Sequence, residues 1–557
     1  MTTDLEKQTL EWGQRQAQTL WSNTFARFDL PWAGATTLDF GCNWGYFCKY
    51  LVERQDVAEA WGVDIRPLWE NVDGWSLADT PRLRLHAGDI RQIAALQSVR
   101  FDILTSAGTF MLLGPSQLKS VLEWLFEHLR PGGWAVFRTR TYLSWLGGDL
   151  HNQLRTPIPH LLFPRRAIDA VLAARGDPPA RYMSPLCAAS YLTLYRRVGF
   201  EIREAIRIPN RIDEATRSLF RDKLGLYDPL ELDTAELLVL LRRPEASADL
   251  SELITESGDA RRSAAPAHGP SGPRATEHHS RVRPAAAACD SPEQTNKSPD
   301  RVSPKEKETI AWGRQQAAAL WNNLYCRYDP IVDGRTVLDL GCSWGYLLMY
   351  LAERFRPARL IGTDIKPWWQ ISAHGWNYAD LGERISFFVG ELAQNRDLPD
   401  RSVDLILCSS VLQYMTPEQI EANLERAYDL LRPGGEMILR TRVFTSYIGA
   451  DLHHDIALPY AHLLYAERDL QRFLGERCGG KAAPYLNWLT ASSYLAIFTR
   501  VGFEVLDVQR RPNRHATDVL ERVIAAYPWI SRAELTCAEL EAHLLRPLEP
   551  EDLSALH

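Results

Sequence analysis

The chain has 557 residues, of which 45% are hydrophobic and 24% charged, an ordinary globular composition with room for more than one domain. Its net charge of −7 excludes a broad electrostatic attraction to nucleic acid or to an anionic membrane. The nine cysteines lack CxxC spacing, and the sequence shows neither a secretory-signal pattern nor a bilayer-spanning apolar run. We therefore expect a cytoplasmic protein with no disulfide framework, no metal site and no membrane partner.

One long repeat organises the chain. Leu38-Asp-Phe-Gly-Cys-Asn-Trp-Gly-Tyr46 recurs as Leu338-Asp-Leu-Gly-Cys-Ser-Trp-Gly-Tyr346, and Leu129-Arg-Pro-Gly-Gly133 recurs as Leu431-Arg-Pro-Gly-Gly435. A repeat of this length is a duplicated domain. We predict one domain over residues 1–245 (copy one) and another over residues 304–557 (copy two). Residues 246–303 are rich in Pro, Ala, Ser and Arg without apolar periodicity, which predicts a flexible linker.

Helical and strand patterns alternate in each copy. Helical spacing opens the copies at 5–28 and 310–328 and returns after the glycine-containing repeat at 46–54 and 346–354. The predicted strands of copy one are 36–39, 60–64, 83–86, 101–105 and 134–138, followed by one from 199–201 onward and one at 235–241. Those of copy two are 336–339, 360–364, 385–389, 403–408 and 436–440, then one from 502–504 onward and one at 538–545. This order predicts an α/β fold with two doubly wound, Rossmann-like, seven-stranded and mostly parallel sheets.

The glycine-containing repeat follows the first strand of each copy, where a doubly wound sheet binds its ligand. Gly41 and Gly45 are four residues apart and follow Asp39, and Asn43 stands between them. A dinucleotide-binding loop instead has G-x-G-x-x-G spacing, so the loop is a poor fit to an NAD-dependent oxidoreductase. The loop and the following helix nevertheless form a cradle that suits a nucleotide.

These motifs resemble those of the class I S-adenosylmethionine-dependent methyltransferases. The loop is similar to their D-x-G-x-G-x-G motif, with a small polar residue for the middle glycine. The resemblance implies S-adenosylmethionine as cofactor, an acid for the ribose after strand two, an acid for the adenine after strand three, and an antiparallel last strand. The residues that it places at the cofactor are Asp39, Gly41, Cys42, Asn43, Gly45, Asp64, Ile65, Asp89, Ile90 and Ser106 in copy one, and Asp339, Gly341, Cys342, Ser343, Gly345, Asp364, Ile365, Glu391, Leu392 and Ser409 in copy two.

Copy one is less typical of that family than copy two. After strand four, copy two has Ser409-Ser-Val-Leu-Gln-Tyr414, which is close to the family's usual segment, whereas copy one has Ala107-Gly-Thr-Phe-Met-Leu112. One alternative is therefore a half-active enzyme in which copy one is a scaffold, a partner-binding module or half of an intramolecular pseudo-dimer. Another is a Rossmann-like unit that binds nothing and uses its glycines only for tight turns.

Each copy inserts about 40 residues after strand five, a length that suggests a functional lid. Both inserts contain Gly-x-Asp-Leu-His, so we name His453 with Asp451, and His151 with Asp149, as candidate bases for a hydroxyl acceptor. The alternative is that Asp-Leu-His caps and packs a lid helix. The candidate substrate-binding residues are Arg140, Arg442, Asn210, Arg211, Asn513 and Arg514. Arg138 and Arg440, beside the first two, could equally close salt bridges at the sheet edge.

These observations favour a tandem methyltransferase that O-methylates a hydroxyl on a small molecule or sugar. The acidic net charge and the His-bearing insert support that acceptor class over nucleic acid. An RNA or protein methyltransferase is the alternative, and a basic, aromatic-lined surface at the mouth of the crevice would favour it.

Overall fold

The computed structural model describes residues 4–71, 80–253, 304–370, 384–449, 451–452, 455–456, 458–477, 485–513 and 518–548. The chain folds as two compact units. Unit 1 comprises Met1–Ile254, Ser410–Tyr428 and Arg440–His557, and unit 2 comprises Thr255–Ser409 and Asp429–Leu439. Unit 1 therefore holds all of copy one together with the C-terminal part of copy two. Of the predicted linker, residues 254–303 lie outside the described residues.

Copy one forms a seven-stranded sheet in the order β3-β2-β1-β4-β5-β7-β6. The strands β1 to β5 pair in parallel, whereas β7 runs antiparallel to both β5 and β6, as predicted. The strands are β1 (Thr36–Phe40), β2 (Glu59–Asp64), β3 (Leu83–Ala87), β4 (Phe101–Ala107), β5 (Leu129–Arg140), β6 (Glu201–Pro209) and β7 (Thr234–Arg242).

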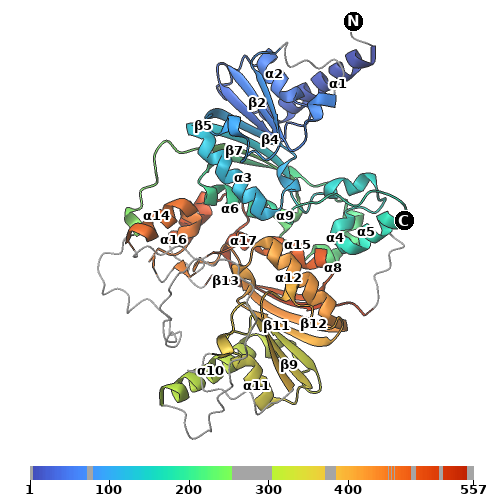
Figure 1. Cartoon of the computed structure of the whole chain (residues 1–557), viewed down its shortest axis with the longest axis vertical. Helices are drawn as coiled ribbons and strands as arrows, with labels where there is room; N and C mark the ends of the chain where they lie inside the picture. The colour runs from blue at the N-terminus through green and yellow to red at the C-terminus, as the bar shows by residue number, and fades with distance from the viewer. Residues whose placement is uncertain are drawn as a thin grey trace. The chain divides into compact units, whose positions relative to one another are not determined.

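The helices of copy one cover its sheet. In Figure 1, α1 packs beside α2, which lies against β1, β2 and β3, while α3 and α6 pack together against β5, β6 and β7. The first helix ends at Leu20 and continues as one wider turn over Trp21–Phe25, so the predicted helix over 5–28 is interrupted. The helices are α1 (Asp4–Leu20), α2 (Tyr46–Arg54), α3 (Pro115–His128), α4 (Pro159–Leu162), α5 (Arg165–Ala174), α6 (Ala188–Val198), α7 (Glu214–Leu219), α8 (Arg221–Leu224) and α9 (Pro229–Leu232).

Copy two repeats this topology with the sheet order β10-β9-β8-β11-β12-β14-β13. Within unit 2, the strands β8 to β11 pair in parallel and α10 packs against α11. The strands are β8 (Thr336–Leu340), β9 (Arg359–Asp364), β10 (Ile385–Val389), β11 (Val403–Ser409), β12 (Leu431–Arg442), β13 (Glu504–Pro512) and β14 (Cys537–Leu545). The helices are α10 (Pro304–Asn323), α11 (Tyr346–Arg354), α12 (Pro417–Leu430), α13 (Ala461–Leu464), α14 (Glu467–Arg477), α15 (Ala491–Val501), α16 (Asp518–Ala526) and α17 (Arg532–Thr536).

The fifth strand begins earlier than the sequence predicts. Leu129 pairs with Phe101, and a register shift follows before Ile103 pairs with Trp134. Gly132 lies in this stretch with φ 76°, a conformation that glycine adopts without steric cost. The Leu-Arg-Pro-Gly-Gly segment thus forms an irregular start of β5 rather than a separate turn.

The last strand of copy two accommodates a buried acid. Glu541 is fully buried on β14 and forms an ion pair with Arg511 on the neighbouring β13. Because that pairing gives the carboxylate a partner within the sheet, the strand continues through Glu541.

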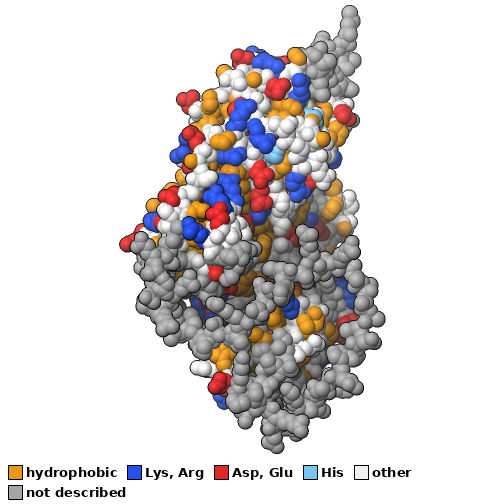
Figure 2. Space-filling view, turned by 60° about the vertical axis from the view of Figure 1, so that its left-hand side comes forward, with side chains coloured by type: hydrophobic (Ala, Val, Ile, Leu, Met, Phe, Trp, Pro, Cys, Tyr) orange, Lys and Arg blue, Asp and Glu red, His pale blue; other side chains and the backbone are white. Residues whose placement is uncertain are grey.

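The described surface carries charges of both signs. Figure 2 shows Lys and Arg side chains close to Asp and Glu side chains on the coloured part of the face that it presents. Among the described residues, no helix has the length and apolarity needed to cross a membrane.

Candidate functional site

The glycine loop of each copy is tied to the acid that ends the second strand. The backbone N–H of Asn43 donates to Asp64 Oδ2 at 3.0 Å, and the N–H of Ser343 donates to Asp364 Oδ2 at 3.0 Å. Asn43 and Ser343 have φ values of 53° and 48°, in the left-handed region that favours glycine. The residue that replaces the middle glycine of the motif therefore keeps a glycine-like backbone, and its N–H fixes the acid beside the loop.

Gly41 allows the loop of copy one to touch the segment after the fourth strand. A Cβ placed on Gly41 would come within 1.9 Å of Thr109 Oγ1, and the residue has φ 80°. Thr109 lies just beyond the end of β4. The carboxyl ends of β1 and β4 therefore lie close together, at the place where a doubly wound sheet forms its ligand-binding crevice.

The first acid of the motif is buried beneath the loop. In copy one, the hydroxyl of Thr105 donates to Asp39 Oδ1 at 2.8 Å. Burial raises the pKa of Asp39 to about 7, although the Thr105 hydrogen bond opposes that rise and the nearby charge of Asp64 adds to it. Burial and the charge of Asp364 likewise raise the pKa of Asp339 to about 7. Asp39 and Asp339 are therefore partly protonated near pH 7 and buried at the strand ends from which the loops begin.

The edge of the loop combines exposed apolar and carboxylate groups. Ile65 and Ile365 follow the second-strand acids and are 68% and 63% exposed. An apolar surface beside an acceptor for hydroxyl donors fits an adenosine moiety. The side chains of Cys42, Cys342, Ile90 and Leu392 are buried, so these predicted cofactor residues can offer only their backbones.

The acid expected to bind the adenine differs between the copies. Asp89 accepts from Arg91 Nε at 2.9 Å and from Arg91 Nη2 at 2.5 Å, a bidentate pairing, and the Arg91 hydrogen bond lowers the pKa of Asp89. Copy two has Glu391 followed two residues later by Ala393, so it lacks a matching arginine at that spacing. Of the two residues predicted after the fourth strand, Ser106 donates its hydroxyl to the Phe40 carbonyl at 2.9 Å, and Ser409 ends β11.

The insert of copy one places Asp149 between two arginines. Asp149 accepts from Arg140 Nη1 at 2.7 Å and from Arg181 Nη1 at 2.9 Å. The imidazole of His151 instead faces the Leu146 carbonyl through Nδ1 at 3.0 Å. Burial would raise the pKa of Asp149, but the hydrogen bond and charge of Arg140 outweigh burial and lower it. Asp149 therefore accepts from two arginines, whereas the ring of His151, which we named together with it, faces a backbone carbonyl.

The corresponding acid of copy two has a partner that the sequence did not suggest. Asp451 accepts from Arg442 Nη1 at 2.6 Å and from the Tyr414 hydroxyl at 2.7 Å. Burial, with the charge of Asp451, raises the pKa of Tyr414 although Arg442 opposes it, so the phenol stays neutral near pH 7. Copy one has Leu112 at the position of Tyr414 in the repeat. The candidate base His453 and the candidate substrate residue Arg514 lie outside the described residues.

The predicted substrate asparagines hold the insert in place. Asn210 accepts from the Trp145 N–H at 2.9 Å and donates to the carbonyls of Leu143 and Leu232 at 2.6 Å and 2.8 Å. Asn513 makes the same three kinds of bond with Tyr447, Thr445 and Thr536. The side-chain oxygen and nitrogen of Asn210 and of Asn513 are both hydrogen-bonded to backbone groups. Each asparagine therefore joins the end of its sixth strand to the insert. Arg211 lies exposed, with its guanidinium 5.5 Å from the Trp145 ring centre.

The arginines beside the predicted substrate residues take part in the sheet. Arg138 Nε donates to Glu236 on the adjacent β7 at 2.6 Å. This pairing matches the sheet-edge salt bridge that we weighed for Arg138.

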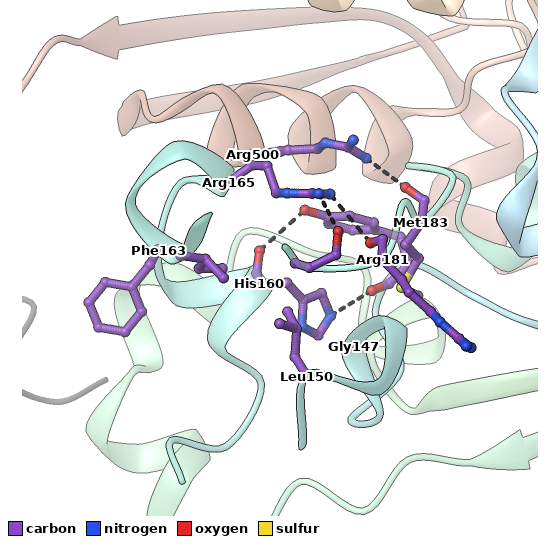
Figure 3. Close-up of a pocket in the computed structure, with 11 residues that line it drawn as sticks. Gly147, Leu150, His160, Phe163, Arg165, Arg181, Met183 and Arg500 are labelled. Carbon is purple, nitrogen blue, oxygen red and sulfur yellow. Dashed lines mark hydrogen bonds between the residues drawn. The ribbon is translucent and has the colours of Figure 1, made fainter. Parts of the chain in front are cut away.

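One histidine in each copy, His160 and His462, is a buried feature to which the sequence analysis gave no role. Their Nε2 atoms face the carbonyls of Tyr142 and Phe444 at 2.8 Å and 2.7 Å (Figure 3 shows the first), and their Nδ1 atoms have no partner among the described residues. Burial lowers the pKa of each to about 4, so both rings are neutral near pH 7. Each packs on a glycine of positive φ, Gly147 or Gly449. The sequence signal for this feature is that Gly147 and His160 are 13 residues apart, and so are Gly449 and His462.

Among the described residues, no cluster of three or more His, Cys, Asp or Glu side chains is arranged to hold a metal ion.

Comparisons with known proteins show what each copy is similar to. A family model described as a methyltransferase domain matches residues 37–133 and 337–435. The chain is similar to a carboxy-S-adenosyl-L-methionine synthase of Chromohalobacter salexigens, with 33% identity over 20% of this chain and 41% of that protein. It is also similar to a trans-aconitate 2-methyltransferase of Methylobacterium radiotolerans, with 34% identity over 20% of this chain and 39% of that protein. The chain thus spans less than half the length of these relatives.

Among solved structures, phosphoethanolamine N-methyltransferase 2 of Haemonchus contortus, in complex with S-adenosyl-L-methionine, aligns with 96% of this chain and 99% of its own. The identity is 11% and the TM-score is 0.29.

Gly41→Ala is expected to weaken the binding of S-adenosylhomocysteine to copy one by more than about ten-fold, because the added methyl group would displace Thr109 and open the crevice. Calorimetric titration of the full chain measures this. Gly34→Ala is the matched control, since Gly34 also has positive φ (75°) but open space around its Cβ position. An equal loss of binding in both variants would show that backbone strain, and not the Thr109 contact, is responsible.

Asp39→Asn combined with Asp339→Asn is expected to flatten the pH dependence of stability between about pH 4 and 7. The folded pKa of each acid is about 7 against 3.8 unfolded, so the stabilisation is full below pH 4 and is lost as the pH rises through 7. Each acid accounts for about 4 kcal/mol of this loss. Denaturant unfolding at pH 4.5 and 7.5 measures it, and an unchanged difference between the two pH values in the double variant would refute the assignment.

Proposed function

Since the chain belongs to the class I S-adenosylmethionine-dependent methyltransferases, with two such domains in tandem and S-adenosylmethionine as cofactor, we propose that it O-methylates a hydroxyl group on a small molecule or sugar. We further propose that the two domains are residues 1–245 and 304–557. The observation that carries the assignment of a cofactor site to each copy is the loop-to-acid hydrogen bond, present at 3.0 Å in both copies.

When bound, S-adenosylmethionine supplies a methyl group activated by its sulfonium. Transfer is an in-line displacement, so the chain contributes mainly by positioning the donor and the acceptor. Asp64 and Asp364 are held by loop N–H groups, which orients their carboxylates toward hydroxyl donors of the cofactor before it binds. The buried acids Asp39 and Asp339 lie at the ends of the strands from which the loops begin.

In copy two, Tyr414 and Asp451 are suited to hold the acceptor. The neutral phenol donates to the carboxylate, and Arg442 balances the charge of Asp451. A substrate hydroxyl can donate to the phenol oxygen or to the carboxylate, which fixes its oxygen lone pair for attack. The proton released on attack passes to a base, for which His453 remains our proposal.

A second candidate function is a half-active enzyme whose copy one serves mainly as a scaffold. Two observations favour it. Copy one has Leu112 where copy two has Tyr414, and Arg91 occupies the carboxylate of Asp89. Adenine binding by Asp89 would require the Arg91 pairing to open, which is a cost to the cofactor site of copy one.

The acceptor class rests on the mixed surface charge, because a methyltransferase for RNA would need a basic surface to bind the phosphate backbone. The seven described cysteines are all free thiols, which supports our proposal of a cytoplasmic location.

A transfer assay tests the proposal. Purified chain and methyl-labelled S-adenosylmethionine are added to an extract of the source cells, and small-molecule, glycan, RNA and protein fractions are separated. We expect label in the small-molecule or glycan fraction. Label confined to RNA or protein would contradict the acceptor class, and no label above that of a Gly41→Ala, Gly341→Ala double variant would contradict the activity.

Tyr414→Phe is expected to lower kcat/KM for the acceptor found in that assay by about ten-fold, because it removes the hydroxyl that aligns the acceptor. Leu112→Phe is the matched control in copy one and is expected to leave that rate unchanged. Equal losses in both variants would contradict the special role of copy two. Steady-state kinetics at saturating S-adenosylmethionine measure both.

A further inference from the structure

The helices α6 and α15 are buried on nearly all sides. Every residue of α6 except Arg196, and every residue of α15 except Thr499, is buried. A helix buried all round must be covered on both faces. On one face, α6 contacts β6 and β7, and α15 contacts β13 and β14. On the other, α6 contacts α13 and α14 of copy two, and α15 contacts α4 and α5 of copy one. All these elements belong to unit 1.

The contacts between α6 and α15 repeat about a pseudo-two-fold axis. Ser190 and Ser493 occupy the same position in the two copies, and their hydroxyl oxygens lie 2.9 Å apart. The Cys187 N–H donates to Ser493 Oγ at 2.9 Å, and the N–H of its counterpart Thr490 donates to Ser190 Oγ at 3.0 Å. A contact in which equivalent residues exchange equivalent bonds is the mark of an isologous interface.

An arginine of each copy also donates a hydrogen bond to the insert of the other copy, and the two arginines occupy equivalent positions. Arg500 of copy two donates through Nη1 to the Met183 carbonyl of copy one at 2.6 Å, and Arg197 of copy one donates through Nη1 to the Leu486 carbonyl of copy two. Both guanidinium groups are buried and paired with acids, Arg500 with Glu421 at 2.7 Å and Arg197 with Glu467 at 2.8 Å. A buried, paired arginine of this kind holds its acceptor in one position.

The carbonyls that these arginines hold belong to short segments, 183–186 and 486–489, beside the predicted acceptor site. The Ser184 N–H donates to the Met111 carbonyl at 2.7 Å, immediately before Leu112, and the Asn487 N–H donates to the Gln413 carbonyl at 3.2 Å, immediately before Tyr414. The two segments thus join each insert to the residues that follow the fourth strand.

Figure 3 shows how Arg500 reaches the insert of copy one. The side chain extends from α15 to Met183 and lines a cavity of about 20 Å³ together with Tyr142 and His160. A cavity of this size holds about one water molecule, so the space is packed and not a substrate pocket. Arg500 therefore supports the wall of the insert from outside copy one.

We propose that Arg500 positions the acceptor side of the copy-one site and that Arg197 positions that of copy two, so that each site is complete only when the other copy is docked on it. The name "acceptor side" rests on the proposed function, whereas the contacts themselves do not. Arg500 and Arg197 are positioning residues, because each acts through a backbone segment.

Hydrogen–deuterium exchange of the full chain tests this proposal without any methyl-transfer assay. Arg500→Met is expected to speed exchange of the Ser184 amide by about ten-fold while leaving the Asn487 amide unchanged, and Arg197→Met is expected to do the reverse. Arg203→Met is the matched control, because Arg203 is exposed and pairs only with Glu201 in the interactions described. It should change neither amide.

Exchange confined to the helix that carries the substituted arginine, or equal loss of protection at both amides, would overturn the proposal. If Arg500→Met unfolds the chain, Arg500→Lys decides the question, because it keeps the charge but loses the fork that reaches Met183. It is expected to raise exchange at Ser184 only, and no change there would refute the assignment. The experiment measures amide protection and not methyl transfer. If each variant affects only the amide in the other copy, but the chain transfers no methyl group, this inference stands and only the proposed function is refuted.

Discussion

The structure of both sites depends on a hydrogen bond between a loop N–H and the acid that ends the second strand. Asn43 and Ser343 reach Asp64 and Asp364 at the same distance, although their side chains differ. In both copies the residue that donates this bond has a left-handed backbone. Loop, acid and strand ends therefore form one arrangement that is set before any ligand binds, which is how a cofactor site limits its reorganisation on binding.

A second constraint comes from the two helices shared by the copies. Residues on every face of α6 and α15 are buried. Separation of the two copies would therefore expose both apolar and polar side chains of these helices to solvent. The serines at the pseudo-two-fold axis satisfy one another only when both copies are present. We propose that the two copies, joined through this interface, form an intramolecular pseudo-dimer. The same docking brings an arginine of each copy to the insert of the other, which links association of the copies to the shape of both sites.

The sequence predicted the elements whose signal is local. The alternation of strands and helices, the antiparallel last strand and the loop that follows β1 are confirmed, because strand periodicity, the family motif and glycine spacing each act over a few residues. Side-chain partners were harder to predict, because they come from distant elements. Asp149 pairs with Arg181 from the far end of the insert, and Asp451 pairs with Tyr414 from the segment after β11. The interface between α6 and α15 had no comparable local signal, since their buried residues include Ser, Thr and Arg as well as apolar side chains.

Calorimetric titration of the intact chain with S-adenosylhomocysteine tests the central claim, that both loops are cofactor sites, most directly. We expect two molecules bound per chain, with binding in copy one opening the pairing of Arg91 with Asp89. Asp64→Asn and Asp364→Asn assign the two binding events, since each removes the charge of one loop-held acid. A stoichiometry of one or of zero would contradict the account.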